Sequence, residues 1–346
     1  MVTHDQSRDI LFMQRAMELA ARGRGSVSPN PMVGCVVVHE NRILGEGWHE
    51  RYGQPHAEVN AIQSVRDRHL LTECTVYVTL EPCAHYGKTP PCADMLVRAG
   101  VKRVVISNID PNPLVAGKGI DKLKAAGIDV SVGPLQREGL DLNRRFFTMI
   151  QKQRPHIILK WAQTADGFMA RENYDSKWIS NAYSRQLTHK WRTEEDAFLV
   201  GTNTARRDNP QLTARDWSGR NPVRIVLDRN LVLPGDLNLF DDSAPTIRYN
   251  QRVDEVRAGE TCVKIEDENF INGVLKDLYQ RKIQSLVVEG GPTTLNRFIS
   301  AGLWDEGRVF VAPVYFEKGI AAPRIMGRSS EIGVGGDRLI TTLPYA

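Results

Sequence analysis

The sequence predicts two α/β domains in one chain, the first of them a three-layer α/β/α sandwich of about five strands. Three observations lead to this prediction. The chain has 346 residues, enough for two domains that each bury a core. In both halves, short apolar runs typical of buried strands alternate with helical periodicities. A helical pattern over residues 140–153 ends at Arg154-Pro155, where a new alternation begins, so we place the domains at 1–152 and 153–346.

The elements of the first half follow in a regular order. A helix is expected over residues 8–22, and it ends at Gly23 and Gly25. Two strands joined by a turn at Asn41 come next, and a helix then begins near His56. The remaining elements alternate between strand and helix. They cover residues 76–80, 92–99 and 104–106, then a helix that follows the turn over residues 117–119 and ends at Ala126, and last a strand over residues 130–132. Open α/β sheets hold their sites at the carboxyl ends of strands, which directs attention to the residues after Leu80.

The second half alternates in the same way and is expected to be mostly parallel. Its apolar runs predict strands over residues 157–161, 197–201, 223–228 and 285–289. Its helical patterns cover residues 184–195, 275–280 and the stretch that follows Gly291.

Two short stretches of the first half form one expected metal site. His56 supplies an imidazole, and Cys83 and Cys92 supply two thiols, a three-ligand set that suits a catalytic zinc with one position left for water. Two thiolates nearly cancel the charge of the metal, so an acid/base group is needed to move the proton of that water. Glu58, two residues after the histidine, is expected to be this group. The eight residues between the cysteines include Lys88, and this donor-rich loop is expected to select the substrate.

Other interpretations of these residues remain open. Cys83 and Cys92 could instead form a disulfide or hold a structural zinc, although such a site has no use for the adjacent Glu58. Asn30, held between two prolines, could reach the edge of a ligand or could serve the geometry of its turn alone. His49 could contact a substrate, but a single histidine at this place is more often a packing or surface residue.

Two glycine turns in the second half suit an anion. One covers Gly201 to Thr204 and the other Gly290 to Leu295, and each follows an expected strand. Neither matches the G-x-G-x-x-G dinucleotide fingerprint, and each taken alone could be a plain turn. Several arginines lie between the two turns or near them, and they form either a phosphate site or a solvated basic face: Arg192, Arg206, Arg207 and Arg215.

Composition narrows the class of protein. The formal net charge of +4 is mild, which suits phosphorylated small molecules and argues against a nucleic-acid partner. The sequence contains no run of 18 apolar residues, so we expect no membrane span. The five cysteines, of which two are assigned to metal, and the polar N-terminal residues lead us to expect a cytoplasmic protein.

His56-x-Glu58 followed by Pro82-Cys83 resembles the signature of zinc deaminases, although the spacing of the cysteines is wider than in the usual P-C-x-x-C. With the Ser28 to Gly34 and Glu81 to Cys92 stretches, and with 176–179, 201–213 and 288–292, the chain resembles the bifunctional deaminase/reductases of riboflavin biosynthesis over nearly its whole length. The resemblance implies a cytidine-deaminase-like first fold and a dihydrofolate-reductase-like second fold. It implies zinc-dependent deamination of a diaminopyrimidinone ribosylamino phosphate, followed by reduction of the ribosyl chain to ribityl with NADPH.

The resemblance also implies roles for individual residues. His56, Cys83 and Cys92 would hold Zn²⁺, and Glu58 would carry the proton. The expected substrate contacts are Asn30, Lys88, Ser176, Arg192, Leu212, Arg215 and Glu289. The expected cofactor contacts are Ala162, Trp178, Thr204, Asp208, Gly291, Pro292, Thr293, Thr294, Leu295, Asn296 and Arg297. One departure from the family is Arg229, which stands where we would expect a small polar residue, and it leaves one cofactor contact open.

Expectations about partners follow from the composition and from the resemblance. We expect a phosphorylated pyrimidine as substrate, a homo-oligomer, and neither nucleic acid nor membrane as partner. The main alternative is a tRNA-type zinc deaminase with an accessory domain, which would need a strongly basic second half bearing aromatic residues. A zinc-stabilised binding module with a degenerate second domain is the non-catalytic alternative.

Overall fold

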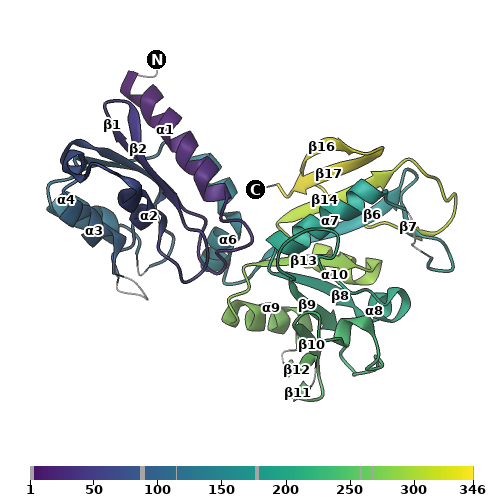
Figure 1. The fold of residues 1–346 in the computed structure, drawn as a ribbon. Coiled ribbons are helices and arrows are strands. Elements are labelled where there is room, and N and C mark those ends of the chain that lie inside the picture. Colours follow the sequence, from purple (N-terminus) through teal and green to yellow (C-terminus); the bar gives the residue numbers. More distant parts are fainter. Residues whose placement is uncertain are drawn as a thin grey trace. The chain divides into compact units, whose positions relative to one another are not determined.

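The structure is a computed structural model that describes residues 4–85, 90–113, 115–175, 179–257, 259–266 and 268–345. It divides into two compact units, Met1–Gln153 and Arg154–Ala346 (Figure 1). Among the described residues, no helix is both long and apolar enough to cross a membrane.

The first unit is built on a five-stranded sheet with the strand order β2-β1-β3-β4-β5. β1 is antiparallel to β2 and β3, whereas β3, β4 and β5 are parallel. The strands are β1 (Gly34–His39), β2 (Arg42–Trp48), β3 (Thr75–Leu80), β4 (Arg103–Asn108) and β5 (Asp129–Val132). The helices are α1 (His4–Ala21), α2 (Ala57–Ser64), η1 (Arg68–Glu73), α3 (Cys92–Ala99), α4 (Lys118–Ala125), α5 (Gln136–Leu142) and α6 (Arg144–Lys152).

Alternating side chains make this unit a three-layer α/β/α sandwich, which confirms the predicted architecture. Successive residues of a strand point to opposite faces of the sheet. Val76 and Val78 of β3 therefore pack in the core formed with α2, α3 and α4, while Tyr77 packs with Phe12 of α1 on the other face. The rings of Phe12 and Tyr77 lie 5.3 Å apart. The α3 helix ends at Gly100, which adopts the left-handed conformation with φ of 66°.

The prediction of a single helix over residues 140–153 was wrong. α5 ends at Leu142 and α6 begins at Arg144, with Asn143 between them at φ −103° and ψ 22°. The buried Asn143 amide accepts a hydrogen bond from the Met32 N–H and donates one to the Met32 carbonyl, both at 2.8 Å. The side chain thus pairs with the backbone of a distant segment, a tertiary contact that a local helical period does not contain.

The second unit is built on a ten-stranded sheet with the order β11-β12-β10-β9-β8-β13-β6-β14-β17-β16 among its described residues. The strands are β6 (His156–Thr164), β8 (Ala197–Gly201), β9 (Val223–Leu227), β10 (Thr246–Asn250), β11 (Glu255–Arg257), β12 (Glu260–Lys264), β13 (Ser285–Gly290), β14 (Glu306–Ala312), β16 (Arg328–Val334) and β17 (Asp337–Leu343). A separate two-stranded sheet pairs β7 (Phe168–Ala170) with β15 (Ile320–Ala321).

The strands from β12 through β14 along this order are parallel, as predicted, and the antiparallel strands lie at the two edges. Helices α9 (Phe270–Gln280) and α10 (Pro292–Ser300) supply Leu278 and Phe298 to the core on one face. α7 (Ala182–Glu194) and α8 (Thr202–Asp208) supply Trp191 and Ala205 to the core on the other face. The short helix η2 (Asn238–Phe240) also contributes residues to this core. Because β9, β8, β13 and β6 are parallel neighbours, their carboxyl ends meet along one edge of the sheet.

Candidate functional site

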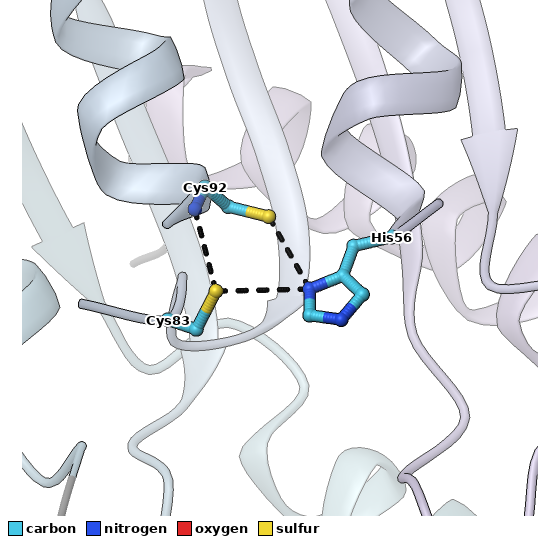
Figure 2. Close-up of side chains that lie close together, drawn as sticks. All are labelled: His56, Cys83 and Cys92. Carbon is cyan, nitrogen blue, oxygen red and sulfur yellow. Dashed lines mark hydrogen bonds between the residues drawn. The ribbon is translucent and has the colours of Figure 1, made fainter. Parts of the chain in front are cut away.

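Three potential metal ligands meet at the carboxyl end of β3 in the first unit. Cys83 follows this strand, Cys92 is the first residue of α3, and His56 is the N-cap of α2 (Figure 2). The His56 Nδ1 atom lies 3.7 Å from Cys83 Sγ and 3.3 Å from Cys92 Sγ. The ligand atoms of all three residues lie within 4.8 Å of one another. Two segments that are separated in sequence therefore converge on one point, as the motif predicts.

This donor set fits a tetrahedral zinc ion. Zinc bonds to sulfur at about 2.3 Å and to nitrogen at about 2.0–2.1 Å, so two such ligands on a tetrahedron lie about 3.5 Å apart. The two nitrogen–sulfur distances lie on either side of this value. Hydrogen bonds from the Cys92 thiol and from His56 lower the pKa of Cys83 to about 4, so one thiolate forms readily. The neighbouring anion and burial raise the pKa of Cys92, and a cation at this point would relieve that repulsion.

Glu58 lies in the first turn of α2, two residues after the N-cap His56. Its side chain is 3% exposed, and burial raises its pKa to about 7, with His56 acting in the opposite direction. Because the N-cap has an extended backbone at φ −74° and ψ 165°, the two residues are not held on separate helix faces. A buried carboxyl group with a pKa near neutrality suits proton transfer.

Asn30 and His49 extend the site beyond the metal ligands. Asn30 Nδ2 lies 3.1 Å from His49 Nε2, and His49 Nδ1 lies 3.1 Å from the Pro55 carbonyl oxygen. A carbonyl only accepts, so Nδ1 donates to it and Nε2 accepts from the Asn30 amide. Burial lowers the pKa of His49, whose ring packs edge-on against His56 at 5.4 Å. His49, which sequence reasoning treated as a packing residue, thus fixes Asn30 beside the metal cluster.

Glu81 anchors the loop beside Cys83. Its two carboxylate oxygens accept hydrogen bonds from the backbone N–H groups of Asp110, Gly117, Gly119 and Ile120 at 2.9–3.3 Å. The anchored loop carries Asp110, a second buried carboxyl group whose pKa burial raises to about 6, with Glu81 and Cys83 adding to the effect. Sequence reasoning missed Asp110 as a site residue, although its place in the loop that follows the predicted strand over residues 104–106 was the available signal.

The second unit contains a cavity of about 760 Å³ along the carboxyl edge of β9, β8, β13 and β6. Both glycine turns open onto it. The turns lie against each other, because a Cβ atom at Gly201 would meet Thr294 Oγ1 at 2.4 Å and one at Gly291 would meet Thr204 Oγ1 at 3.1 Å. Backbone amides at two adjacent strand ends therefore face one space, an arrangement suited to phosphate groups.

A largely buried group of three charged side chains lies at the β6 and β13 end of the cavity. Lys160 Nζ lies 3.7 Å from Glu289 Oε1, and the Arg192 guanidinium lies 3.2 Å from Glu289 Oε2. Burial tends to raise the pKa of Glu289, but Lys160 and Arg192 lower it overall. Burial lowers the pKa of Lys160, and Glu289 opposes this effect. Lys160 was missed at the sequence level because a lysine within an apolar strand carries no motif.

The structure brings some of the predicted residues of the second half to this cavity and not others. Those that line it are Ala162, Thr204, Asp208, Glu289, Gly291, Pro292, Thr293, Thr294 and Arg297. Asn296 lines an adjoining hollow instead. The side chains of Leu212 and Leu295 are fully buried in the core, and Arg215 is exposed outside the cavity lining. Arg192 does not line the cavity itself, but its guanidinium contacts Glu289, which does. Lys88, Ser176 and Trp178 lie outside the described residues.

Comparison with protein families assigns a class to each unit. Residues 6–108 match the cytidine and deoxycytidylate deaminase zinc-binding region, and residues 155–329 match the RibD C-terminal domain. The fold and the two sites therefore define a zinc-dependent deaminase joined to a reductase of dihydrofolate-reductase-like fold that uses a nicotinamide cofactor.

Full-length relatives identify the family. The riboflavin biosynthesis protein RibD of Aquifex aeolicus is 43% identical over 335 residues, which cover 95% of this chain and 91% of that protein. RibD of Bacillus amyloliquefaciens is 41% identical, with 91% and 87% covered. The crystal structure of a diaminohydroxyphosphoribosylaminopyrimidine deaminase/5-amino-6-(5-phosphoribosylamino)uracil reductase from Thermotoga maritima matches with a TM-score of 0.89 and 37% identity over 99% of this chain and 100% of that one. The chain belongs to the RibD family of bifunctional riboflavin biosynthesis enzymes.

Proposed function

We propose that this chain deaminates a diaminopyrimidinone carrying a ribosylamino phosphate and then reduces the ribosyl chain to ribityl with NADPH. The observation that carries the first step is the convergence of His56, Cys83 and Cys92 within 4.8 Å, beside the buried Glu58. The second step is supported by a cavity that joins two amide-rich turns to a buried charged group. In this proposal deamination belongs to residues 1–152 and reduction to residues 153–346.

In the deaminase site, His56 Nδ1 and the two cysteine sulfurs would hold Zn²⁺, which when bound activates water for hydrolysis. Glu58 takes one proton from the attacking water and delivers it to the pyrimidine ring nitrogen. It then takes a second proton from the hydroxyl that this water has become and delivers it to the amino group, which leaves as ammonia. The raised pKa of Glu58 suits both halves of this exchange. Asn30, oriented by His49, offers its amide oxygen to the edge of the ring. Lys88, in the loop between the cysteines, is proposed to contact the substrate phosphate.

In the reductase site, the two glycine turns would bind the pyrophosphate of NADPH, and Lys160 and Glu289 mark the end where the sugar is reduced. Hydride transfer depends mainly on holding the nicotinamide against the sugar carbon. Lys160 can donate hydrogen bonds to the opening sugar. Glu289 holds the Lys160 side chain in place and is itself held by Arg192. The proposed cofactor contacts are Ala162, Trp178, Thr204, Asp208 and residues 291–297, and the proposed substrate contacts are Ser176, Arg192, Leu212, Arg215 and Glu289. Leu212 and Leu295 would act through their backbone atoms, because their side chains are buried in the core.

Product analysis tests both steps on the purified full-length chain. Without nicotinamide cofactor, mass spectrometry is expected to show the amino group replaced by oxygen and the ribosyl chain unchanged. With NADPH, the product is expected to gain two hydrogens on its sugar chain. Reduction of the diamino compound before deamination, or deamination that requires NADPH, would contradict the proposal. A homo-oligomeric state and a cytoplasmic location remain predictions, which light scattering and cell fractionation test.

A further inference from the structure

Arg229 lies at the opposite end of the reductase cavity from Lys160 and Glu289. It follows β9 and lines both the main cavity and an adjoining hollow of about 940 Å³. Its guanidinium lies over the ring of Phe270, with the carbon 4.6 Å from the ring centroid. Phe270 is 2% exposed, so the aromatic platform is fixed in the core and holds the arginine at the cavity wall.

A second arginine faces the same point. Arg297 of α10 also lines both hollows, and burial together with Arg297 lowers the pKa of Arg229. Among the described residues, neither guanidinium forms a salt bridge with a carboxylate, although Glu268 lines the adjoining hollow. Two neighbouring arginines without a carboxylate partner repel each other, and a dianion between them would relieve that repulsion.

The strand order shows which part of a dinucleotide reaches these arginines. Along the carboxyl edge the sequence is β9 with Arg229, β8 and β13 with the two glycine turns, and β6 with Lys160. Three strand spacings of about 4.8 Å separate the ends, roughly 14 Å in all, a span suited to an extended dinucleotide. If the pyrophosphate lies at the central turns and the nicotinamide near Lys160, the adenosine ribose lies at the β9 end.

We propose that Arg229, with Arg297, forms a subsite for the phosphate on the 2′-oxygen of the adenosine ribose, so that Arg229 makes this chain select NADPH over NADH. The inference rests on the proposed binding of a nicotinamide cofactor in this cavity. An arginine fork matches the geometry of a phosphate, whereas a free ribose hydroxyl offers no charge to it. Arg206 and Arg207 lie elsewhere on the cavity wall, where Arg207 stacks on Tyr174 at 3.9 Å.

Steady-state reduction with each cofactor tests the subsite in the full-length chain. Arg229→Ser is expected to raise KM for NADPH roughly ten- to a hundredfold, the loss of one or two charge-assisted hydrogen bonds. KM for NADH and KM for the phosphorylated sugar are expected to stay within about twofold of wild type. Arg229→Lys is expected to keep part of the NADPH preference because it keeps the charge but not the fork.

Arg252→Ser is the matched control. Arg252 lies on the neighbouring loop, is exposed, and donates to Asn230 Oδ1 at 3.1 Å, but it does not line the cavity. Arg252→Ser removes the same charge as Arg229→Ser. Unchanged kinetics in Arg252→Ser would therefore show that long-range attraction does not account for the rise in KM for NADPH. Calorimetry with 2′,5′-ADP and 5′-ADP gives a second measurement. Wild type is expected to bind 2′,5′-ADP more tightly, and Arg229→Ser is expected to remove that difference.

Specific outcomes would overturn the inference. An equal rise in KM for NADPH and NADH in Arg229→Ser would place Arg229 at the pyrophosphate. A rise in KM for the sugar phosphate alone would place it in the substrate site. An unchanged preference between 2′,5′-ADP and 5′-ADP would show that it contacts neither. Failure of wild type to oxidise either cofactor would instead overturn the proposed reduction itself, and the nucleotide-binding measurement would still decide the role of Arg229.

Discussion

The two units build their sites in different ways. In the first, three ligands and a carboxylate come from short stretches around residues 56–58 and 83–92, and they meet within a few ångströms. In the second, the cavity is lined from Lys160 to Ile320 by side chains at the ends of several strands. A site made of local motifs depends on a few atoms, whereas a site made by sheet topology distributes its contacts. Single substitutions are therefore expected to abolish the first activity and to weaken the second gradually.

The largest expected effect is that of Cys83→Ser. Cys83 is the thiolate of the cluster, and a hydroxyl is a poor replacement as a zinc ligand. We expect loss of both zinc and deamination, measured by metal analysis and product formation, with reduction of supplied deaminated substrate retained. A variant that kept stoichiometric zinc would contradict the assignment of Cys83 as a ligand. Cys74→Ser, a change at a buried cysteine outside the cluster, serves as the control.

Glu58→Gln is expected to separate metal binding from catalysis. The amide cannot accept a proton but has nearly the shape of the carboxyl group, so zinc content should stay near that of wild type. Deamination is expected to fall by roughly 10²–10⁴-fold, the usual contribution of a general acid/base. Loss of metal in this variant would mean that Glu58 is a ligand and not the proton carrier.

The same contrast explains how far the sequence could be interpreted. The deaminase cluster and the order of elements around it were predicted because ligand spacing, strand runs and caps are local. Lys160 was missed because its role arises only when separate strands align. Asp110 was missed because its burial and its contact with the charges of Glu81 and Cys83 arise only when separate loops come together. Arg192 was predicted from the family resemblance, but its partner Glu289 lies 97 residues away, a pairing that no local pattern contains. The C-terminal strands β16 and β17 went unpredicted because β16, at the sheet edge, is largely exposed and carries no continuous apolar run.

A smaller effect is expected for Glu289→Gln. The change leaves Lys160 and Arg192 as two buried cations without their shared carboxylate. Removing one partner of a buried charged group costs about 3–5 kcal/mol, so the free energy of unfolding of the second unit is expected to fall by about 3 kcal/mol at neutral pH. The pKa of Glu289 is lower in the folded than in the unfolded chain, so its contribution is present at neutral pH and is lost as pH falls below about 4.

Chemical denaturation of wild type and Glu289→Gln across this pH range checks the prediction. The difference between the two proteins should narrow towards acid pH. A difference that is constant over the whole range would show that packing, rather than charge, accounts for the loss of stability.

The smallest effect is expected for Arg215→Ala. Arg215 was predicted to bind the substrate phosphate, and the structure places its side chain at the surface outside the cavity lining. An exposed charge contributes less than a buried one, so KM of the reductase for the phosphorylated sugar is expected to rise by about tenfold at most, with KM for NADPH unchanged. A larger effect on NADPH than on the sugar would assign Arg215 to the cofactor.

Mixing two variants, each of which lacks one of the two activities, most directly tests the claim that one chain holds two separate sites. Glu58→Gln should lack deamination and keep reduction. Gly291→Val, whose added Cβ lies 3.1 Å from Thr204 Oγ1 between the two turns, should keep deamination and lack cofactor binding. We predict that neither variant alone converts the diamino substrate and NADPH into the ribityl product, and that the mixture does, as followed by mass spectrometry. Failure of the mixture, with each variant still active on its own step, would contradict free passage of the intermediate between independent sites.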